Sequence, residues 1–353
     1  MSWAAVDAVL ARAVAEGVTP SVDLEVRAGG EVVYSARVGQ AQLQPLARPL
    51  ADDTRWDLAS LTKVLAGASV CYALIDRGQL SFEDRVRRYV PGVDGRITVA
   101  HLLSHTAGYV PWRPLYERVD AAGLAWGSPA ARRLVLREAA LEPLQSRPGA
   151  QHAYSDLGFL VLCAALEAVG GQRLDRLWRA LVAEPAGWTG LVWGSPRAAA
   201  TERCPRRGGV IVGQVHDLNC ASMGGVSSHA GLFGDAAAVG LAGQTFLDAF
   251  HGRGPLAGDA IRRAWTTRGV GSHWLGWDGR EGENSSSGAR FPSDAVGHLG
   301  FTGTSLWIAP RQQVVVALLT NRVHPSVDDI RIRDLRPAVH DAVVGALDGL
   351  GRW

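Results

Sequence analysis

Apolar and polar residues follow helical and strand-like patterns that predict most of the secondary structure. Helical apolar patterns predict helices at 1–17, 60–76, 97–108, 128–142, 156–169, 174–187, 236–250 and 334–350. Apolar and aromatic runs predict strands at 272–277, 304–310 and 313–321, and Gly29-Gly30 divides 22–39 into the two strands of a hairpin. Segments 186–230 and 283–288 are predicted to be loops, the second of them exposed.

The predicted strands come from both ends of the chain, and the predicted helices fill its middle. This order indicates an α/β (α+β) fold, in which an antiparallel sheet carries terminal helices and a helical region is inserted between its strands. We therefore expect one unit over 1–353. Its sheet-plus-helix part would comprise 1–76 and 240–353, and its mainly helical insertion 77–239.

Composition and charge narrow the class of protein. The chain is 47% apolar and 20% charged, with a formal net charge of +2, which is typical of a soluble globular protein. No run reaches 18 apolar residues, so no membrane contact is expected. The arginines are scattered, and their densest run, 331–336, is predicted to be a solvated helix start, so nucleic acid is not an expected partner.

The chain start and the cysteines suggest a compartment. Residues 1–17 carry acidic residues inside an amphipathic pattern, unlike the basic start and apolar stretch of a signal peptide. The four cysteines are far apart and form no C-x-x-C pair. We expect a cytoplasmic, reduced setting.

Lys63 is the only lysine among 36 Lys and Arg residues, so the other 35 are arginines. Arginine stays protonated in proteins, whereas burial can lower the pKa of a lysine by several units. A lone lysine in a buried helix therefore suggests a neutral amine that accepts a proton. Drift of the composition toward arginine would explain the same count without a function.

Ser60 precedes Lys63 by three residues, so the two side chains share one face of the predicted helix. Free N–H groups near a helix start can bind an anion. A hydroxyl, a desolvated amine and N–H donors are the parts of an activated serine nucleophile. Tyr154, just before the helix at 156–169, is a candidate proton donor for the leaving group, or it simply packs against that helix.

Three ordered motifs carry a resemblance to a known family. SLTK (60–63), YSD (154–156) and HLG (298–300) resemble those of the serine β-lactamase and penicillin-binding-protein superfamily, most closely its class C-like esterase and peptidase branch. ITVAHLLSHTAG and GHLGFTGTSLWIAP also resemble segments of that branch. The resemblance covers nearly the whole chain.

The resemblance implies a role for each motif. Ser60 would be the nucleophile, Lys63 the base that takes its proton, and Tyr154 the relay that protonates the leaving group. The backbone N–H groups of Ser60 and Phe301 would form the oxyanion hole, whose donors face charge that develops in the transition state. No cofactor is implied, and the glycines show no phosphate-binding spacing.

Two departures from the family bear on the substrate. His298 and Leu299, which precede Gly300 in the third motif, replace the lysine and threonine that bind the antibiotic's carboxylate in β-lactamases. Histidine is only partly charged near neutral pH and leucine makes no hydrogen bond, so carboxylate recognition should be weaker. Asp156 replaces an asparagine and adds negative charge; it either contacts the substrate or caps the helix near Leu157.

Aromatic residues and histidines offer further candidates. Tyr109, Trp112, Trp274 and Trp277 fall in segments that border the cleft by the same resemblance, and they form either an apolar substrate pocket or part of the core. His101 and His105 are spaced as in helical zinc sites, but no third ligand is evident, so no metal site is expected.

The expected function is a serine hydrolase, specifically a carboxylesterase that acts on small neutral esters through a Ser60 acyl-enzyme. The alternatives are a β-lactamase, a D-amino-acid peptidase or amidase, an acyltransferase, or a binding protein that has lost catalysis. The expected partner is a small acyl substrate, and the oligomeric state is left open.

Overall fold

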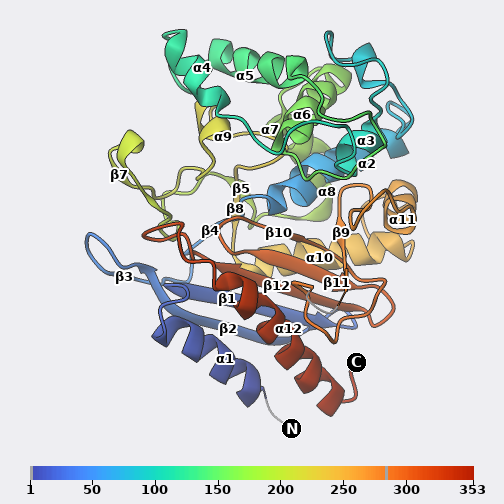
Figure 1. Cartoon of the computed structure of the whole chain (residues 1–353). Coiled ribbons are helices and arrows are strands. Elements are labelled where there is room, and N and C mark those ends of the chain that lie inside the picture. Colours follow the sequence, from blue (N-terminus) through green and yellow to red (C-terminus); the bar gives the residue numbers. More distant parts are fainter. Residues whose placement is uncertain (1–2, 283–284) are drawn as a thin grey trace.

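The computed structural model describes residues 3–282 and 285–353. Within them, seven strands form one antiparallel sheet in the order β3-β2-β1-β12-β11-β10-β9 (Figure 1). The strands are β1 (Ser21–Ala28), β2 (Glu31–Gln42), β3 (Arg48–Pro49), β9 (Asp278–Gly279), β10 (Val296–Leu299), β11 (Ser305–Ala309) and β12 (Val314–Thr320). The predicted antiparallel sheet and its hairpin at Gly29-Gly30 are confirmed.

Helices cover both faces of this sheet. The terminal helices α1 (Ala4–Ala15) and α12 (Ile332–Gly349) lie side by side on one face, and α10 (Ala236–Phe250) lies on the other (Figure 1). Because successive side chains of a strand point to opposite faces, the fully buried β12 contributes to two cores. Val314, Val316 and Leu318 pack with the terminal helices, and Val315, Ala317 and Leu319 pack with the helical region.

The helical region lies above the sheet in Figure 1. Its α-helices are α2 (Ser69–Asp76), α3 (Val99–Leu103), α4 (Leu115–Ala121), α5 (Pro129–Leu141), α6 (Asp156–Gly170), α7 (Leu174–Trp178), α8 (Glu184–Ala186), α9 (Leu218–Ser222) and α11 (Asp259–Thr266). Residues Lys63–Ala68 and Arg179–Ala183 form π-helices, and Val86–Arg88 and Pro205–Arg207 form 3₁₀-helices. The predicted boundary at residue 240 falls inside α10.

The segment predicted as loop, 186–230, contains more regular structure than expected. β5 (Val192–Trp193) and β4 (Trp56–Asp57) flank β8 (Leu232–Gly234) in a small sheet, and β6 (Arg203–Cys204) pairs with β7 (Gly209–Val210). Strands of two residues are too short to produce a periodic pattern, which is why the sequence did not reveal them.

Two further predictions are wrong. The strand expected at 272–277 is a tight turn, because Gly276 has a φ of 103° and the N–H of Trp274 bonds the carbonyl of Trp277 at 2.7 Å. In the loop 283–288, the first two residues lie outside the described ones. Ser285 and Ser287 are buried, not exposed, and their hydroxyls bond each other at 2.9 Å.

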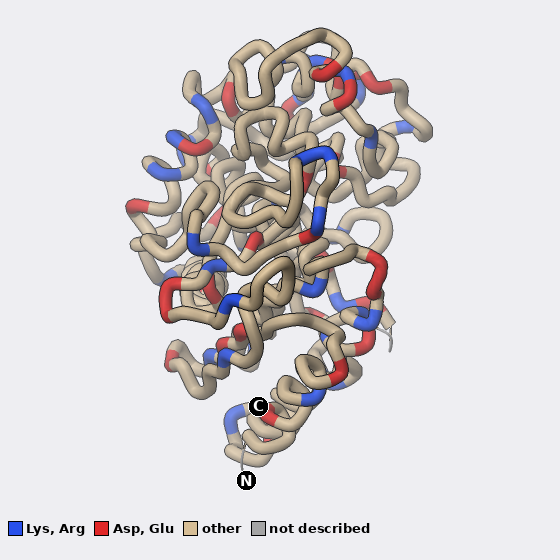
Figure 2. The backbone as a smooth tube through the Cα atoms, turned by 90° about the vertical axis from the view of Figure 1, so that its left-hand side faces the viewer, with Lys and Arg blue, Asp and Glu red and all other residues tan. Residues whose placement is uncertain are grey.

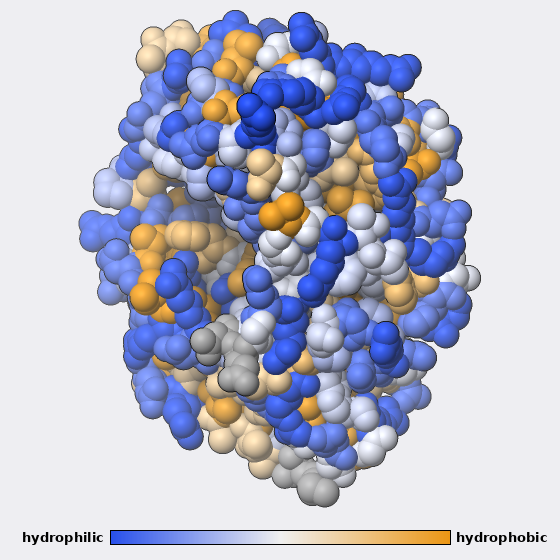
Figure 3. All heavy atoms as spheres, turned by 45° about the vertical axis from the view of Figure 1, so that its right-hand side comes forward, coloured by the Kyte–Doolittle hydropathy of each residue, from blue (hydrophilic) through white to orange (hydrophobic). Residues whose placement is uncertain are grey.

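The surface is largely polar. Positions of both charge signs are interspersed along the backbone (Figure 2). The face in Figure 3 is mostly hydrophilic, with a hollow at mid-height that has apolar residues along its lower edge. Among the described residues, no single helix is long and apolar enough to cross a membrane. Within that part of the chain, only α6 and the helical segment Leu174–Ala186, taken together, reach that length and apolarity, and the two are bent by 69° relative to each other.

The helix predicted at 60–76 is irregular where it was expected to be regular. It winds as a π-helix over Lys63–Ala68 and continues as α2, and π-helices often occur at functional sites. Gly67 lies in this segment, and a Cβ there would be 2.7 Å from the carbonyl oxygen of Ser228. A side chain at position 67 would therefore push the helix away from the 226–230 segment.

Gly67→Ala should destabilise the protein by about 1–3 kcal/mol, because the added methyl group overpacks a rigid backbone contact. The free energy of unfolding in urea measures this. Gly95→Ala is the control, since its Cβ would meet only Arg87 at 3.6 Å and should change stability by less than about 0.5 kcal/mol. Equal stability of the two variants would contradict the close packing.

Candidate active site

A strained turn presents Ser60. Ala59 has a φ of 46°, a left-handed conformation that costs a residue with a side chain about 1–3 kcal/mol. The buried carboxylate of Asp57 accepts the N–H of Ala59 at 2.8 Å and that of His216 at 2.6 Å. Asp57 therefore holds the turn in the conformation that brings Ser60 to the cavity wall.

Lys63 is fully buried and bonds two oxygens. Its Nζ donates to Ser60 Oγ at 2.8 Å and to Asp156 Oδ1 at 2.6 Å. Burial alone lowers the pKa of Lys63, but the Asp156 carboxylate and the Tyr154 hydroxyl more than offset this, so the pKa lies above its ordinary value. The predicted neutral amine is therefore wrong for the resting protein, in which Lys63 is an ammonium ion.

Asp156 does not cap α6. Ser155 is the cap, because its Oγ accepts the N–H of Gly158 at 3.2 Å. Asp156 is the first residue of the helix, and its carboxylate pairs with Lys63 while lining the cavity. The prediction that Asp156 caps the helix is therefore wrong. The alternative, contact with substrate, is compatible with its position on the cavity wall.

Tyr154 lies beside the Ser60–Lys63 pair. Its hydroxyl is close enough to both side chains for them to lower its pKa, and Lys63 Nζ is 4.7 Å from the centre of its ring. Burial raises the pKa of Tyr154 above its ordinary value although the nearby ammonium lowers it. The side chain is thus a neutral phenol at neutral pH and has a proton to give.

The N–H groups of Ser60 and Phe301 have no hydrogen-bond acceptor within 3–282 and 285–353. The segments that carry them are tied together, since Thr302 Oγ1 donates to the carbonyl of Asp57 at 2.7 Å and Thr304 Oγ1 to that of Leu58 at 3.1 Å. These bonds fix the spacing of the two segments, as an oxyanion hole requires.

The third-motif residue Gly300 lines the same cavity and is tightly enclosed. A Cβ at this position would overlap Thr304 Oγ1 and lie 2.7 Å from the carbonyl oxygen of Leu58. Only glycine therefore allows the segment before Phe301 to approach the turn before Ser60 this closely.

The site opens into a cavity of about 830 Å³. Its apolar lining includes Trp112, Leu218, Leu299, Phe301, Ile330 and Ile332. Trp112 and Leu299, two of the residues predicted to contact substrate, line this cavity. Tyr109, Trp274 and Trp277 are not among the residues that line the cavity: all three are buried in the larger apolar core, which the helical region shares with one face of the sheet.

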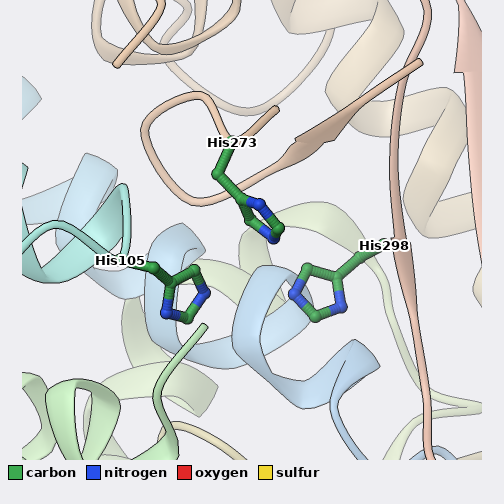
Figure 4. Close-up of side chains that lie close together, drawn as sticks. All are labelled: His105, His273 and His298. Carbon is green, nitrogen blue, oxygen red and sulfur yellow. The ribbon is translucent and has the colours of Figure 1, made fainter. Parts of the chain in front are cut away.

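Three buried histidines lie beside Tyr154. His105, His273 and His298 each turn a ring nitrogen toward the other two (Figure 4), and one nitrogen from each lies within 4.8 Å of the others. Burial, followed by neighbouring histidines and Lys63, lowers the pKa of His273 to about 3 and those of His105 and His298 well below the ordinary value. The prediction that His298 is partly charged near neutral pH is therefore wrong.

The proton positions on these rings do not fit a metal site. The N–H of Ser155 donates to His105 Nδ1 at 3.0 Å, which leaves the proton of the neutral ring on Nε2. A histidine ligand needs the opposite arrangement, with its other nitrogen donating. His298 has that arrangement through Leu299 O at 2.8 Å. The described cluster therefore does not offer three lone pairs to one cation.

Sequence reasoning missed two buried arginines beside the site, Arg322 and Arg336. The run 331–336 was predicted to be solvated, and Arg331 and Arg333 are exposed, but Arg336 is buried. The helical spacing of Arg336 could have revealed its burial. Ile332 and Val339, four residues before and three residues after Arg336, are both on the buried face of α12. Nothing in the local sequence around Arg322 marked it.

The family model described as Beta-lactamase matches residues 6–340. Over 350 residues, the chain is 30% identical to an Escherichia coli (strain K12) protein named "Putative D-alanyl-D-alanine carboxypeptidase", with 88% of this chain and 80% of that protein covered. A Salmonella typhimurium protein of the same name is 29% identical over 353 residues, with 89% and 81% covered.

Solved structures share the fold. "EstCE1, a hydrolase with promiscuous acyltransferase activity" superposes with a TM-score of 0.74 at 22% identity, covering 96% of this chain and 98% of that one. The octameric penicillin-binding protein homologue from Pyrococcus abyssi gives a TM-score of 0.73 at 18% identity, covering 99% and 78%. Together with the family match over nearly the whole chain, these similarities confirm the predicted superfamily and fold: the chain belongs to the beta-lactamase family of serine hydrolases.

Proposed function

We propose that this protein hydrolyses carboxylic esters through an acyl-enzyme on Ser60. The observation that carries the proposal is the position of Ser60 Oγ, which lies 2.8 Å from Lys63 Nζ and faces a largely apolar cavity. The free N–H groups of Ser60 and Phe301 are suited to stabilise the negative oxygen of the tetrahedral intermediate.

Acylation requires Lys63 to lose a proton first. Its ammonium group, which bonds the Asp156 carboxylate at 2.6 Å, releases that proton to solvent as the pH rises, and the resulting amine takes the proton of Ser60 as Oγ bonds the carbonyl carbon. Tyr154 protonates the departing alcohol and is reprotonated by Lys63. Water then attacks the acyl carbon, and the reverse transfers release the acid and restore Ser60.

Ester preference follows from the charges around the scissile bond. His298 is neutral and Leu299 is apolar, so the third motif supplies no fixed cation for a substrate carboxylate. The Asp156 carboxylate beside Lys63 adds negative charge that repels an anionic group at the same place. Uncharged acyl and alcohol groups therefore suit this part of the cavity best.

A D-amino-acid carboxypeptidase is the second candidate, and Arg333 favours it. This arginine lines the cavity, and its side chain has no ion pair or hydrogen bond to any residue that the structure describes. It is free to bind the terminal carboxylate of a peptide. The name of the E. coli relative points to the same activity.

A substrate panel tests the two candidates. Purified protein is assayed with p-nitrophenyl acetate and butyrate, nitrocefin, and a peptide ending in D-Ala-D-Ala, and Ser60→Ala is the control for each. We expect kcat/KM to be highest for the esters. Release of D-alanine at a higher kcat/KM, together with its loss in Arg333→Gln, would replace the first candidate by the second.

Asp156→Asn should move the rise of kcat/KM with pH to lower pH. The carboxylate holds the pKa of Lys63 above its ordinary value, so the wild type needs alkaline pH to populate the amine. Without the carboxylate, burial dominates and lowers that pKa. The full pH profile measures the shift.

Lys63→Arg serves as the reference for this profile, because guanidinium keeps its proton and should leave no activity at any pH. If kcat/KM of Asp156→Asn rose at the same pH as that of the wild type, the role of Asp156 in setting the protonation of Lys63 would be contradicted.

Phe301→Pro should lower kcat by about 100- to 1000-fold, the usual cost of losing one oxyanion-hole donor, because proline has no N–H. Phe301→Ala keeps the N–H and should retain kcat within about 10-fold. Ester hydrolysis under saturating substrate measures both, with circular dichroism as a check of folding. Equal kcat in the two variants would exclude the Phe301 N–H as a donor.

A further inference from the structure

Arg322 and Arg336 are buried cations with unusual partners. Their exposed fractions are 8% and 7%, and neither forms an ion pair with any described carboxylate. Burying a cation without a counter-ion is costly. Burial, followed by the charge of Arg322, lowers the pKa of Arg336 to about 9, which reflects that cost. Such charges persist when backbone dipoles stabilise them.

The two guanidinium groups bind the carbonyls of consecutive residues. Arg336 Nη2 donates to the carbonyl of Gly300 at 2.7 Å, and also to that of Thr304 at 3.0 Å. Arg322 donates to the carbonyl of Phe301 from Nε at 2.9 Å and from Nη2 at 2.7 Å. Both carbonyls flank the N–H of Phe301.

The carbonyl of Gly300 accepts from Arg336 and also from the N–H of Gly303 at 3.0 Å, and together these bonds set where the Phe301 N–H points. In a trans peptide the carbonyl and the N–H lie on opposite sides, and the Gly300–Phe301 peptide is not one of the cis bonds. With its oxygen on Arg336, this peptide directs the Phe301 N–H away from Arg336. A charged donor on the carbonyl also polarises the amide and strengthens its N–H as a donor.

We propose that Arg336 is a positioning residue of the oxyanion hole, which orients and polarises the Gly300–Phe301 peptide so that the Phe301 N–H stabilises the tetrahedral intermediate. The inference rests on the proposed function and deepens it. Because the oxyanion exists only after nucleophilic attack, the contribution of Arg336 appears in kcat and not in the binding of substrate.

A competing role predicts the opposite kinetics. Arg336 lines the cavity, and its Nε has no partner within the part of the chain that the structure describes. An arginine that binds a substrate carboxylate through this nitrogen would act mainly on KM. A neutral ester, which has no such carboxylate, removes this role from the measurement.

Arg336→Gln and Arg336→Lys test the proposal with p-nitrophenyl butyrate and with a fluorophosphonate, which labels an activated serine. In Arg336→Gln we expect kcat and the labelling rate to fall roughly 10- to 100-fold, less than removal of a donor costs, with KM nearly unchanged. Arg336→Lys should be intermediate, since an ammonium group binds one carbonyl without the planar fork.

Arg132→Lys is the matched control. This arginine is equally buried (8% exposed) but bonds Glu167 and the carbonyl of Val226 in the helical region. It should lose stability and keep kcat. An increase in KM at unchanged kcat in the Arg336 variants, or unchanged labelling, would overturn the inference while leaving the proposed function intact. A wild type that neither hydrolyses esters nor labels would instead refute the proposed function.

A second measurement does not depend on activity or on the folding of Arg336→Gln. Only two phenylalanines, Phe159 and Phe301, follow a glycine. Protein labelled with ¹³C-carbonyl glycine and ¹⁵N-phenylalanine therefore gives two selected amide signals. The Phe301 signal should shift in Arg336→Lys, whereas that of Phe159, inside α6, should not. An unmoved Phe301 signal would overturn the proposal.

Discussion

The site depends on one buried ion pair, between Lys63 and Asp156. An ammonium group without a counter-ion would be costly at this depth, and the carboxylate at 2.6 Å makes it tolerable. The same pair holds the Ser60 hydroxyl, because Lys63 donates to Ser60 Oγ and to Asp156 Oδ1 at the same time. Burial is the main reason that the pKa values of His105 and His298 are lowered, and the charge of Lys63 lowers them further.

The two halves of the site come from different parts of the fold. Ser60 and Lys63 belong to the segment that enters the helical region, while Phe301 follows β10 of the sheet. Hydroxyls of Thr302 and Thr304 join these parts through the carbonyls before Ser60. The proposed oxyanion hole therefore lies where the helical region and the sheet meet.

Sequence patterns predicted the elements with strong periods and the residues that share a motif. The helices at 236–250 and 334–350 and the hairpin at 22–39 have long apolar patterns, and their positions agree with the structure. Pattern reasoning failed where a turn overrides composition, as at Gly276, and where strands are only two residues long.

The protonation states of the site residues were less predictable than the identity of those residues. SLTK, YSD and HLG identify Ser60, Lys63 and Tyr154 as neighbours, but protonation depends on contacts across the fold. Lys63 was expected to be neutral because burial was considered without Asp156, which lies 93 residues away. His298 was expected to titrate near its ordinary pKa, because the sequence does not reveal its burial.

β12 has a consequence for how the molecule comes apart. Its alternate side chains belong to two separate apolar clusters, one beneath the terminal helices and one beneath the helical region. Unfolding of either cluster would expose one face of β12 to solvent while its other face remained buried in the second cluster. The two clusters are thus linked through a shared wall, and heat or denaturant should melt them in a single cooperative transition.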